Sequence, residues 1–195
     1  TGNRDNMYGK YWITVEARNM AGNKATMDEN EYWFINPILG ITTNNILNFN
    51  EADSGEIIYS NSINIQNSGD PGSGVYVFLD ISGEDLQASD ENSLCNGNNF
   101  FSLENIYYYA ENYQFTTFNN SEADSEGFVV VPYNDNPIMG NFSNLRDYYV
   151  SNILWPQSNI PFKLRLNVPE NCHGQFSGKI KITGWEPANP KENVT

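Results

Sequence analysis

The sequence has no apolar run long enough to span a bilayer, and it has few basic residues. Ten Lys and Arg stand against 24 Asp and Glu, which gives a formal net charge of −14. Nucleic-acid phosphates and anionic lipids are bound through clustered Lys and Arg. We therefore expect no nucleic-acid partner and no direct membrane insertion in this segment.

Cysteine and histidine are nearly absent. Cys95 and Cys172 are the only cysteines, and His173 is the only histidine. There is no Cys-x-x-Cys spacing, and a structural zinc ion normally needs four ligands. In a secreted protein the favoured interpretation is a Cys95–Cys172 disulfide, whereas in a cytosolic protein two buried thiols would be the better interpretation.

Groups for catalysis are equally sparse. His173 lies beside Cys172 in an expected turn, and side chains of adjacent residues diverge along an extended chain, so the two do not form a catalytic dyad. Carboxylate neighbours such as Glu84 with Asp85, Asp90 with Glu91, and Glu122 with Asp124 fall in expected loops of a very acidic chain. Nothing visible would raise the pKa of one member, so we assign no catalytic residue and predict that the chain is not an enzyme.

Two kinds of attachment stay open. Oxygen-rich clusters at 90–93, 122–125 and 134–136 could contribute to a structural calcium site, but none has the EF-hand pattern, and solvated turns are the favoured interpretation. We assign no cofactor and leave metal binding unknown. Three Asn-x-Ser/Thr sequences predict glycosylation of Asn119, Asn141 and Asn193 if the protein crosses an archaeal or eukaryotic membrane.

What the chain does contain is β-sheet chemistry. It has 12 Tyr, 11 Phe and 4 Trp, and aromatic residues suit a pleated, half-buried surface. Most rings are expected to pack in the core. A sugar-stacking role for some of them is the alternative, and the candidate rings are Trp12, Trp33, Trp155, Trp185, Tyr107, Tyr108, Tyr109, Tyr148 and Tyr149.

The first block of the chain predicts a β-hairpin with one buried face. Apolar Tyr11, Ile13, Val15 and Ala17 alternate with Trp12, Thr14, Glu16 and Arg18, which is the period of a strand. A turn at 19–23 and a second extended run ending at 32–35 complete the hairpin. The run 11–23 resembles the penultimate strand and turn of immunoglobulin-like or fibronectin-III-like modules in microbial surface proteins, which implies the end of a partial module.

The second block predicts an antiparallel sandwich of seven to nine strands. Ile46 and Leu47 open a strand; 56–66 is a strand with Ile57, Tyr59, Ile63 and Ile65 on one face; 75–81 is a strand, and Leu86 re-enters the core. Further extended runs are expected at 100–109 and 128–132, polar loops at 87–99 and 134–147, and an ambiguous element at 148–155. The alternating runs 162–168 and 176–183 predict a closing hairpin.

This block is similar to a β-sandwich module of archaeal-type surface proteins. The similarity rests on the runs 62–69 and 75–86, and on 162–169 with Gly174 and Gly178. It implies an extracellular location and carries no catalytic residue.

We therefore expect an all-β, immunoglobulin-like antiparallel β-sandwich at 39–185, preceded by a hairpin of a partial module at 1–38 and followed by a polar tail at 186–195. The start at Thr1 without a signal peptide suggests a piece of a longer polypeptide or a processed form. The expected function is a non-catalytic structural or adhesive segment of a surface protein, including a self-assembling filament or layer subunit, with other subunits, neighbouring modules or glycans as partners. The alternative is a carbohydrate-binding module of a secreted enzyme.

Overall fold

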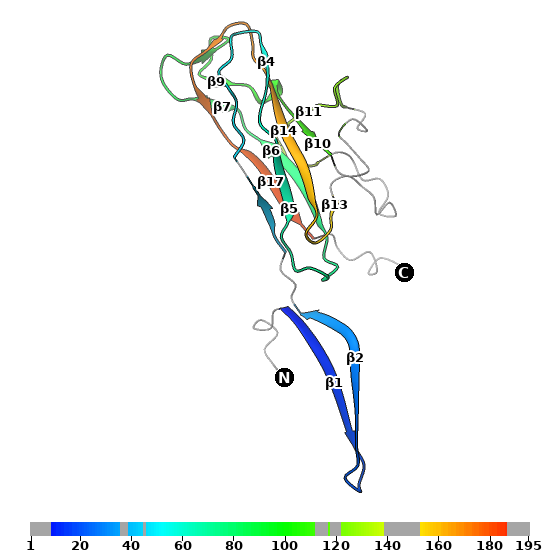
Figure 1. Ribbon diagram of the computed structural model, residues 1–195. Helices are drawn as coiled ribbons and strands as arrows, with labels where there is room; N and C mark the ends of the chain where they lie inside the picture. Colours follow the sequence, from blue (N-terminus) through cyan, green and yellow to red (C-terminus); the bar gives the residue numbers. More distant parts are fainter. Residues whose placement is uncertain are drawn as a thin grey trace, which may run out of the picture.

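A computed structural model gives the fold of the chain and describes residues 9–35, 39–44, 46–111, 117, 122–138 and 153–186. In these residues the fold is all-β, with antiparallel sheets and no α-helix. The chain forms a long hairpin and a larger part, here called the body, which comprises the described residues from 39 onward (Figure 1). The expected all-β class is confirmed.

The first sheet of the body has the strand order β11-β10-β14-β5-β3, and β4 also pairs with β14. Its longest strand is β14, which pairs on one side with β10 and on the other with β4 and β5. The strands are β3 (Ile41–Thr43), β4 (Ile57–Tyr59), β5 (Ile63–Asn67), β10 (Ile106–Ala110), β11 (Val129–Val130) and β14 (Asn159–Asn167).

The second sheet is built around β6 (Val77–Gly83). It pairs with β12 (Asn136–Pro137), β13 (Ile153–Leu154) and β17 (Ile180–Trp185). Short pieces extend the far end of the body, and one turn of 3-10 helix, Leu103–Asn105, precedes β10. These pieces are β7 (Leu86–Ala88), β8 (Leu94–Cys95), β9 (Phe100–Phe101), β15 (Cys172–His173) and β16 (Phe176–Ser177).

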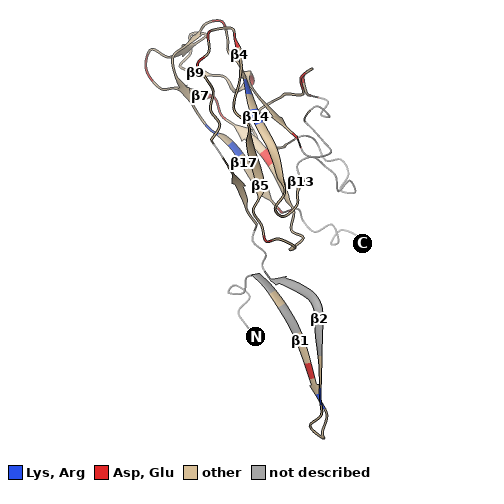
Figure 2. Cartoon of the chain, viewed as in Figure 1, with Lys and Arg blue, Asp and Glu red and all other residues tan. Residues whose placement is uncertain are grey.

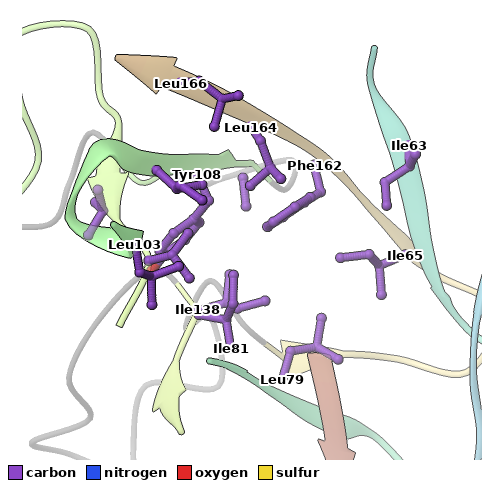
Figure 3. Close-up of a cluster of buried hydrophobic side chains, with 14 of the residues drawn as sticks. Ile63, Ile65, Leu79, Ile81, Leu103, Tyr108, Ile138, Phe162, Leu164 and Leu166 are labelled. Carbon is purple, nitrogen blue, oxygen red and sulfur yellow. The ribbon is translucent and has the colours of Figure 1, made fainter. Parts of the chain in front are cut away.

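The core lies between the two sheets. Alternate side chains of each strand point inward, and several are completely buried. Figure 3 labels Ile63, Ile65, Leu79, Ile81, Leu103, Tyr108, Ile138, Phe162, Leu164 and Leu166 in this cluster. The expected inward faces of 77–81 and 162–166 are therefore correct, and Leu86 packs against the core as expected.

The expected single strand at 56–66 is wrong in one respect. It is two strands, β4 and β5, separated at 60–62, where the Ser60 hydroxyl accepts a hydrogen bond from the Leu164 N–H at 2.8 Å. The interruption changes which side chains face inward. Ile63 and Ile65 are buried, but Ile57 and Tyr59 are exposed. A one-residue change of register moves a strand's side chains to the opposite face, which a simple alternation pattern does not reveal.

The strand expected to open at Ile46 and Leu47 is also wrong. The first strand of the body is β3, and residues 46–50 have no strand assignment. Asparagine side chains replace the ladder here: the Asn61 side-chain oxygen accepts from the Asn48 N–H at 2.7 Å, and the Asn61 amide donates to the Ile46 carbonyl at 3.0 Å. Side-chain bonds of this kind compete with regular strand pairing.

The expected closing hairpin is wrong as well. β14 and β17 lie in different sheets: β14 pairs with β4, β5 and β10, whereas β17 pairs with β6. The connection between them therefore crosses from one sheet to the other. Cys172 lies on this crossing and is joined to Cys95 by a disulfide, while His173 pairs with Leu94. Alternation correctly predicts β14, but the single strand expected at 176–183 is two strands, β16 and β17, which pair with β7 and β6.

The sequence predictions for residues 87–109 and 128–155 are correct in part. The run 100–109 is extended at both ends but contains the 3-10 turn, and the loop expected at 87–99 contains the short strand β8. The strand expected at 128–132 is β11. Within 134–147 and 148–155, the structure shows β12 and β13, and residues 139–152 lie outside the described part.

Candidate interaction surface

The N-terminal hairpin is the most isolated element of the structure. β1 (Gly9–Arg18) and β2 (Lys24–Ile35) pair with each other and form a separate two-stranded sheet. In Figure 1 this hairpin extends away from the body. The hairpin and its turn confirm the sequence prediction. Because each strand has a single partner in the described chain, each has one edge of unpaired backbone groups.

The turn at the tip is held by local asparagine contacts. The Asn19 side-chain oxygen accepts a hydrogen bond from the Asn23 N–H at 2.8 Å, and the Asn19 carbonyl accepts one from the Gly22 N–H at 3.0 Å. Gly22 has a φ of +80°, which an L-residue with a side chain rarely adopts. Met20 is fully exposed at the end of this turn. The sequence therefore specifies a tight tip that carries an apolar side chain into solvent.

Charges beside the tip support the pairing of the two strands. Arg18 Nε lies 2.7 Å from Glu16 Oε1, and Lys24 of β2 is an ion-pair partner of the same carboxylate. The hydrogen bond from Lys24, and after it that from Arg18, lowers the pKa of Glu16. Such exposed pairs contribute little stability and are screened by salt.

At Val15 and Ala17 the buried face expected for this hairpin is not observed. Val15 is 56% exposed, and Ala17, on the same face by alternation, is exposed too. The sequence pattern correctly predicts an apolar face, but no sheet of the described chain covers it. An isolated hairpin is at best marginally stable in water, so this face and its two open edges are suited to contact with additional strands.

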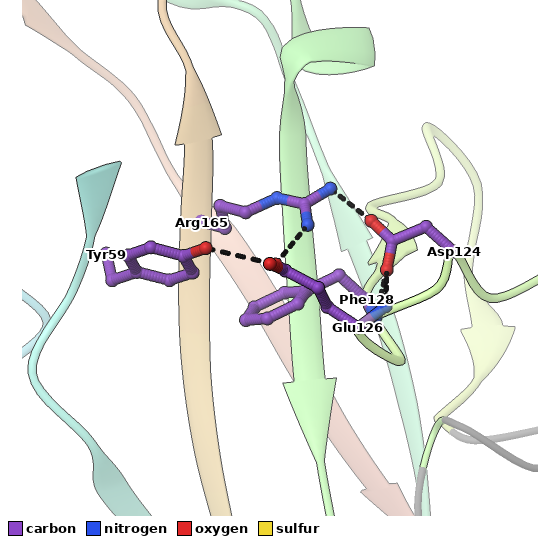
Figure 4. A network of polar contacts seen from close by, with 5 residues as sticks. All are labelled: Tyr59, Asp124, Glu126, Phe128 and Arg165. Atoms are coloured by element: carbon purple, nitrogen blue, oxygen red, sulfur yellow. Dashed lines mark hydrogen bonds and ion pairs between the residues drawn. The ribbon is translucent and has the colours of Figure 1, made fainter. Parts of the chain in front are cut away.

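A second feature is a polar network on the outer face of the first sheet (Figure 4). Arg165, on β14, is buried and forms ion pairs with Asp124 and with Glu126, the latter at 3.1 Å. The Tyr59 hydroxyl donates to the same Glu126 oxygen at 3.0 Å. The guanidinium carbon lies 4.6 Å from the centroid of the Phe128 ring. The network thus clamps the turn 124–128 onto the sheet.

The electrostatics of this network favour a fixed charge pattern. Partial burial acts to raise the pKa of Asp124, but hydrogen bonds from the Phe128 N–H, from Arg165 and from the Glu126 N–H together outweigh it and lower the pKa. Burial, followed by the hydrogen bond to Glu126, raises the pKa of Tyr59. At neutral pH the acid is ionised and the phenol is protonated, which suits a structural clamp.

The outer face of the second sheet carries a row of rings. Trp155 contacts Tyr76 with centroids 5.5 Å apart, and Phe78 stacks on Trp185 at 4.9 Å. Trp155 is 50% exposed and Trp185 is 39% exposed. Asp80 lies in the same row and is hydrogen-bonded by Trp185.

The other aromatic candidates lie elsewhere. Tyr108 is buried, and Tyr107 and Tyr109 are half-buried. Trp12 and Trp33 have no described side chain, and Tyr148 and Tyr149 lie outside the described residues.

Two of the acidic residues noted in the sequence, Asp85 and Asp90, accept hydrogen bonds within loops. Asp85 Oδ1 accepts hydrogen bonds from the Leu103 N–H at 2.8 Å and from the Tyr133 hydroxyl at 2.7 Å. Asp90 Oδ1 accepts one from the Asn92 N–H at 2.9 Å. His173 is exposed on β15. Asp85 and Asp90 therefore each have a loop-stabilising contact.

The sequence also raised metal binding, glycosylation and a disulfide. In the described part of the chain, no group of three or more His, Cys, Asp and Glu side chains is placed to hold a metal ion. The candidate glycosylation residues Asn119, Asn141 and Asn193 lie outside the described residues. The structure does contain the Cys95–Cys172 disulfide, which was the favoured pairing.

No helix within the described ranges is long and apolar enough to cross a membrane. Comparison with protein-family models and with the sequences of curated proteins gave no match.

Proposed function

We propose that the chain is a non-catalytic, extracellular structural or adhesive segment of a larger surface protein, and that its body is an immunoglobulin-like β-sandwich. Two antiparallel sheets enclosing one apolar core support a sandwich. The disulfide that joins the crossing after β14 to the loop at Cys95 supports an oxidising, extracellular compartment. The net charge of −14 supports protein or glycan partners rather than nucleic acid.

The observation that carries the proposal is the exposed hairpin. Its strands have open edges and an apolar face, and unpaired edges recruit strands from other chains or modules. The segment would therefore act by strand addition, either to a neighbouring module of its own polypeptide or to another subunit. Repeated addition between identical chains would give a filament or a surface layer.

The distribution of net charge favours contact between a hairpin and a body over contact between two bodies. Residues 1–38 contain four basic and five acidic residues, whereas residues 39–185 contain five basic and 17 acidic residues. Two bodies therefore repel each other, while the nearly neutral hairpin can approach either. Figure 2 shows the basic residues of the described body on β14 and on or beside β17.

The assembly state of the full chain tests the proposal. Light scattering and sedimentation velocity over a series of concentrations should show growth into larger species, and negative-stain microscopy should show ordered filaments or sheets. Val15→Asp places a charge on the apolar face of the hairpin and should abolish this growth. Thr14→Asp is the matched control, because it adds the same charge to the opposite face of the same strand.

A wild-type chain that stays monomeric at every concentration would contradict self-assembly. Equal assembly of Val15→Asp and Thr14→Asp would contradict a role for the apolar face of the hairpin.

The second candidate function is carbohydrate binding, and the exposure of Trp155 and Trp185 favours it. Exposed aromatic rings beside a carboxylate are suited to stacking on a sugar ring while an acid accepts its hydroxyl hydrogen bonds. Screening of the full chain against a glycan array tests this function. Binding that is lost in Trp155→Ala and retained in Tyr133→Ala, another exposed aromatic of the body, would support it.

A further inference from the structure

The body has an open apolar groove along the seam between its two sheets. One part of it, of about 450 Å³, is lined by residues that include Leu47, Phe176, Lys179 and Ile180. The adjoining part, of about 340 Å³, is lined by Ile41, Thr42, Thr43, Leu47, Ile63, Ile65, Ile180 and Ile182. Leu47 and Ile180 line both parts, so the two hollows adjoin, and together they are here called the seam groove.

The seam groove exists because neither of its margins is a complete ladder. On one side, the chain leaves regular pairing after β3, and Ile46 of the following segment is largely exposed. On the other side, β17 pairs with β6 and with no second strand in the described chain. The groove therefore lies directly beside the open edge of β17.

The backbone of this open edge can accept another strand. The Ile138 N–H donates to the Leu79 carbonyl at 2.9 Å, so Leu79 is bonded toward β12. The next residue, Asp80, then bonds toward β17, where it faces Thr183. The backbone groups of Thr183 therefore point toward β6, and those of its neighbours Ile182 and Gly184 point away from β6. The N–H and C=O of Ile182 thus point to the open edge, and its side chain lines the groove.

We infer that β17 is the acceptor for a second copy of this chain, whose strand β1 adds to the open edge and places Val15 and Ala17 in the seam groove. This inference rests on the proposed self-assembly and names its second surface. The hairpin offers an edge with an apolar face on one side, and the body offers an edge beside an apolar groove. Strand addition satisfies the backbone groups of both edges and buries both apolar surfaces.

Charged groups of both signs meet at the same place. Lys179 lines the groove, and Lys181 is exposed on β17, where it is ion-paired with Asp135 at 3.1 Å. Glu16 alternates with Val15 and Ala17 and thus lies on the other face of β1. Glu16 is ion-paired with Arg18 and Lys24 in the hairpin, and adding β1 to β17 brings this cluster to the side where Lys181 is paired with Asp135. Because the donor and acceptor surfaces differ, the contact is head-to-tail and leads to an open chain of subunits.

Mixing two blocked variants tests the acceptor. Val15→Asp blocks the donor and leaves the acceptor intact, whereas Ile182→Asp blocks the acceptor and leaves the donor intact. Each should stop at the monomer alone, and a 1:1 mixture should give dimers that do not grow, as measured by sedimentation velocity. Near-native circular dichroism of each variant shows that it is folded.

Two charge-reversal variants test the acceptor without changing an apolar side chain. Lys179→Glu should weaken assembly of the full chain by about tenfold at low salt, with a smaller effect at high salt. Lys163→Glu, the same charge reversal on the first sheet, should leave assembly unchanged.

The outcomes separate the two proposals. A wild-type chain that never assembles overturns the proposed self-assembly. A wild-type chain that assembles, together with Lys179→Glu that assembles equally well and a mixture that gives no dimer, overturns β17 as the acceptor and leaves self-assembly standing.

Discussion

Arg165 lies over the ring of Tyr107, with its guanidinium carbon 4.5 Å from the ring centroid. The two residues face each other across the ladder between β14 and β10. Two carboxylates and two rings surround this one cation, although its Nε is buried without a hydrogen-bond partner among the described residues. Because the guanidinium is desolvated, its partners decide whether the outer face of the first sheet is stable.

We predict that Arg165→Ala lowers the free energy of unfolding by about 2 kcal/mol. Breaking a buried pair costs about 3–5 kcal/mol, but Asp124 and Glu126 are 32% and 56% exposed and regain hydration when the cation is removed. Urea denaturation followed by tryptophan fluorescence measures the change. Lys163→Ala on the same strand is the control and should cost less than about 1 kcal/mol. Equal losses in the two variants would show that the Arg165 network has no special role.

Asp80 and Asp135 should respond to pH with opposite signs. Burial is the main cause that raises the pKa of Asp80, and the neighbouring Asp135 adds to it, whereas Trp185 and Lys181 oppose it. One oxygen of Asp80 is also buried without a hydrogen-bond partner in the described chain. Because the folded-state pKa lies above the unfolded value, ionisation as pH rises through that window costs stability. Asp80→Asn should therefore raise the free energy of unfolding by about 0.5 kcal/mol at about pH 7.

The same variant should show no gain at about pH 3, where Asp80 is protonated in both states. Asp135→Asn is the matched comparison. The Ser82 hydroxyl, and then Lys181, lowers the pKa of Asp135, so its ionised form supports the fold above the unfolded pKa and that support is lost in acid. Asp135→Asn should lower stability at about pH 7. Denaturation curves that shift in the same direction for both variants would contradict these assignments.

The disulfide should contribute a large part of the stability of the body. Cys95 and Cys172 are 77 residues apart, and the chain-entropy estimate for a loop of that size is about 4 kcal/mol. We predict that Cys95→Ser with Cys172→Ser lowers the free energy of unfolding by about 2–4 kcal/mol. Reduction of the wild-type chain should give the same loss. Mass spectrometry without reductant should find no free thiol, and alkylation of both cysteines under those conditions would rule out the bridge.

Local pattern predicted the strands well and their partners poorly. Alternation correctly predicted the hairpin at 9–35 and the inward faces of β6 and β14. It failed at Ser60, where a break in the ladder changes the parity of the strand, because that break depends on contacts with Leu164 far along the chain. It failed again for β14 and β17, because two neighbouring alternating runs look the same whether they pair or lie in opposite sheets.

The candidate surfaces, too, could be predicted from the sequence only in part. The apolar face of β1 could be predicted from its period, and its exposure could not, since exposure depends on what packs against it. The Arg165 network was missed, because Arg165 in an alternating strand looks like an ordinary solvent-facing residue. The sequence signal was weak: Lys163 and Arg165 are two of only ten basic residues and the chain has an aromatic run at 107–109, but only the structure shows that the two segments pair.

Asn67 directly follows the strand expected at 56–66, and the sequence pattern assigned it no role. The structure buries it completely at the end of β5. Its side-chain amide donates to the Leu154 carbonyl at 2.9 Å and to the Val75 carbonyl at 3.2 Å, while its side-chain oxygen accepts from the Gly69 N–H at 2.8 Å. One side chain thus ties the first sheet to β13 of the second sheet and closes the turn after β5.

Asn67→Ala should lower the free energy of unfolding by about 2–4 kcal/mol, because it leaves buried backbone groups of three residues without partners. Asn64→Ala is the matched control on the same strand: Asn64 is exposed, so the change should stay within about 0.5 kcal/mol. Guanidinium denaturation of both variants measures the difference. If Asn67→Ala is as stable as Asn64→Ala, the amide does not hold the two sheets together, and the apolar core alone determines how they pack.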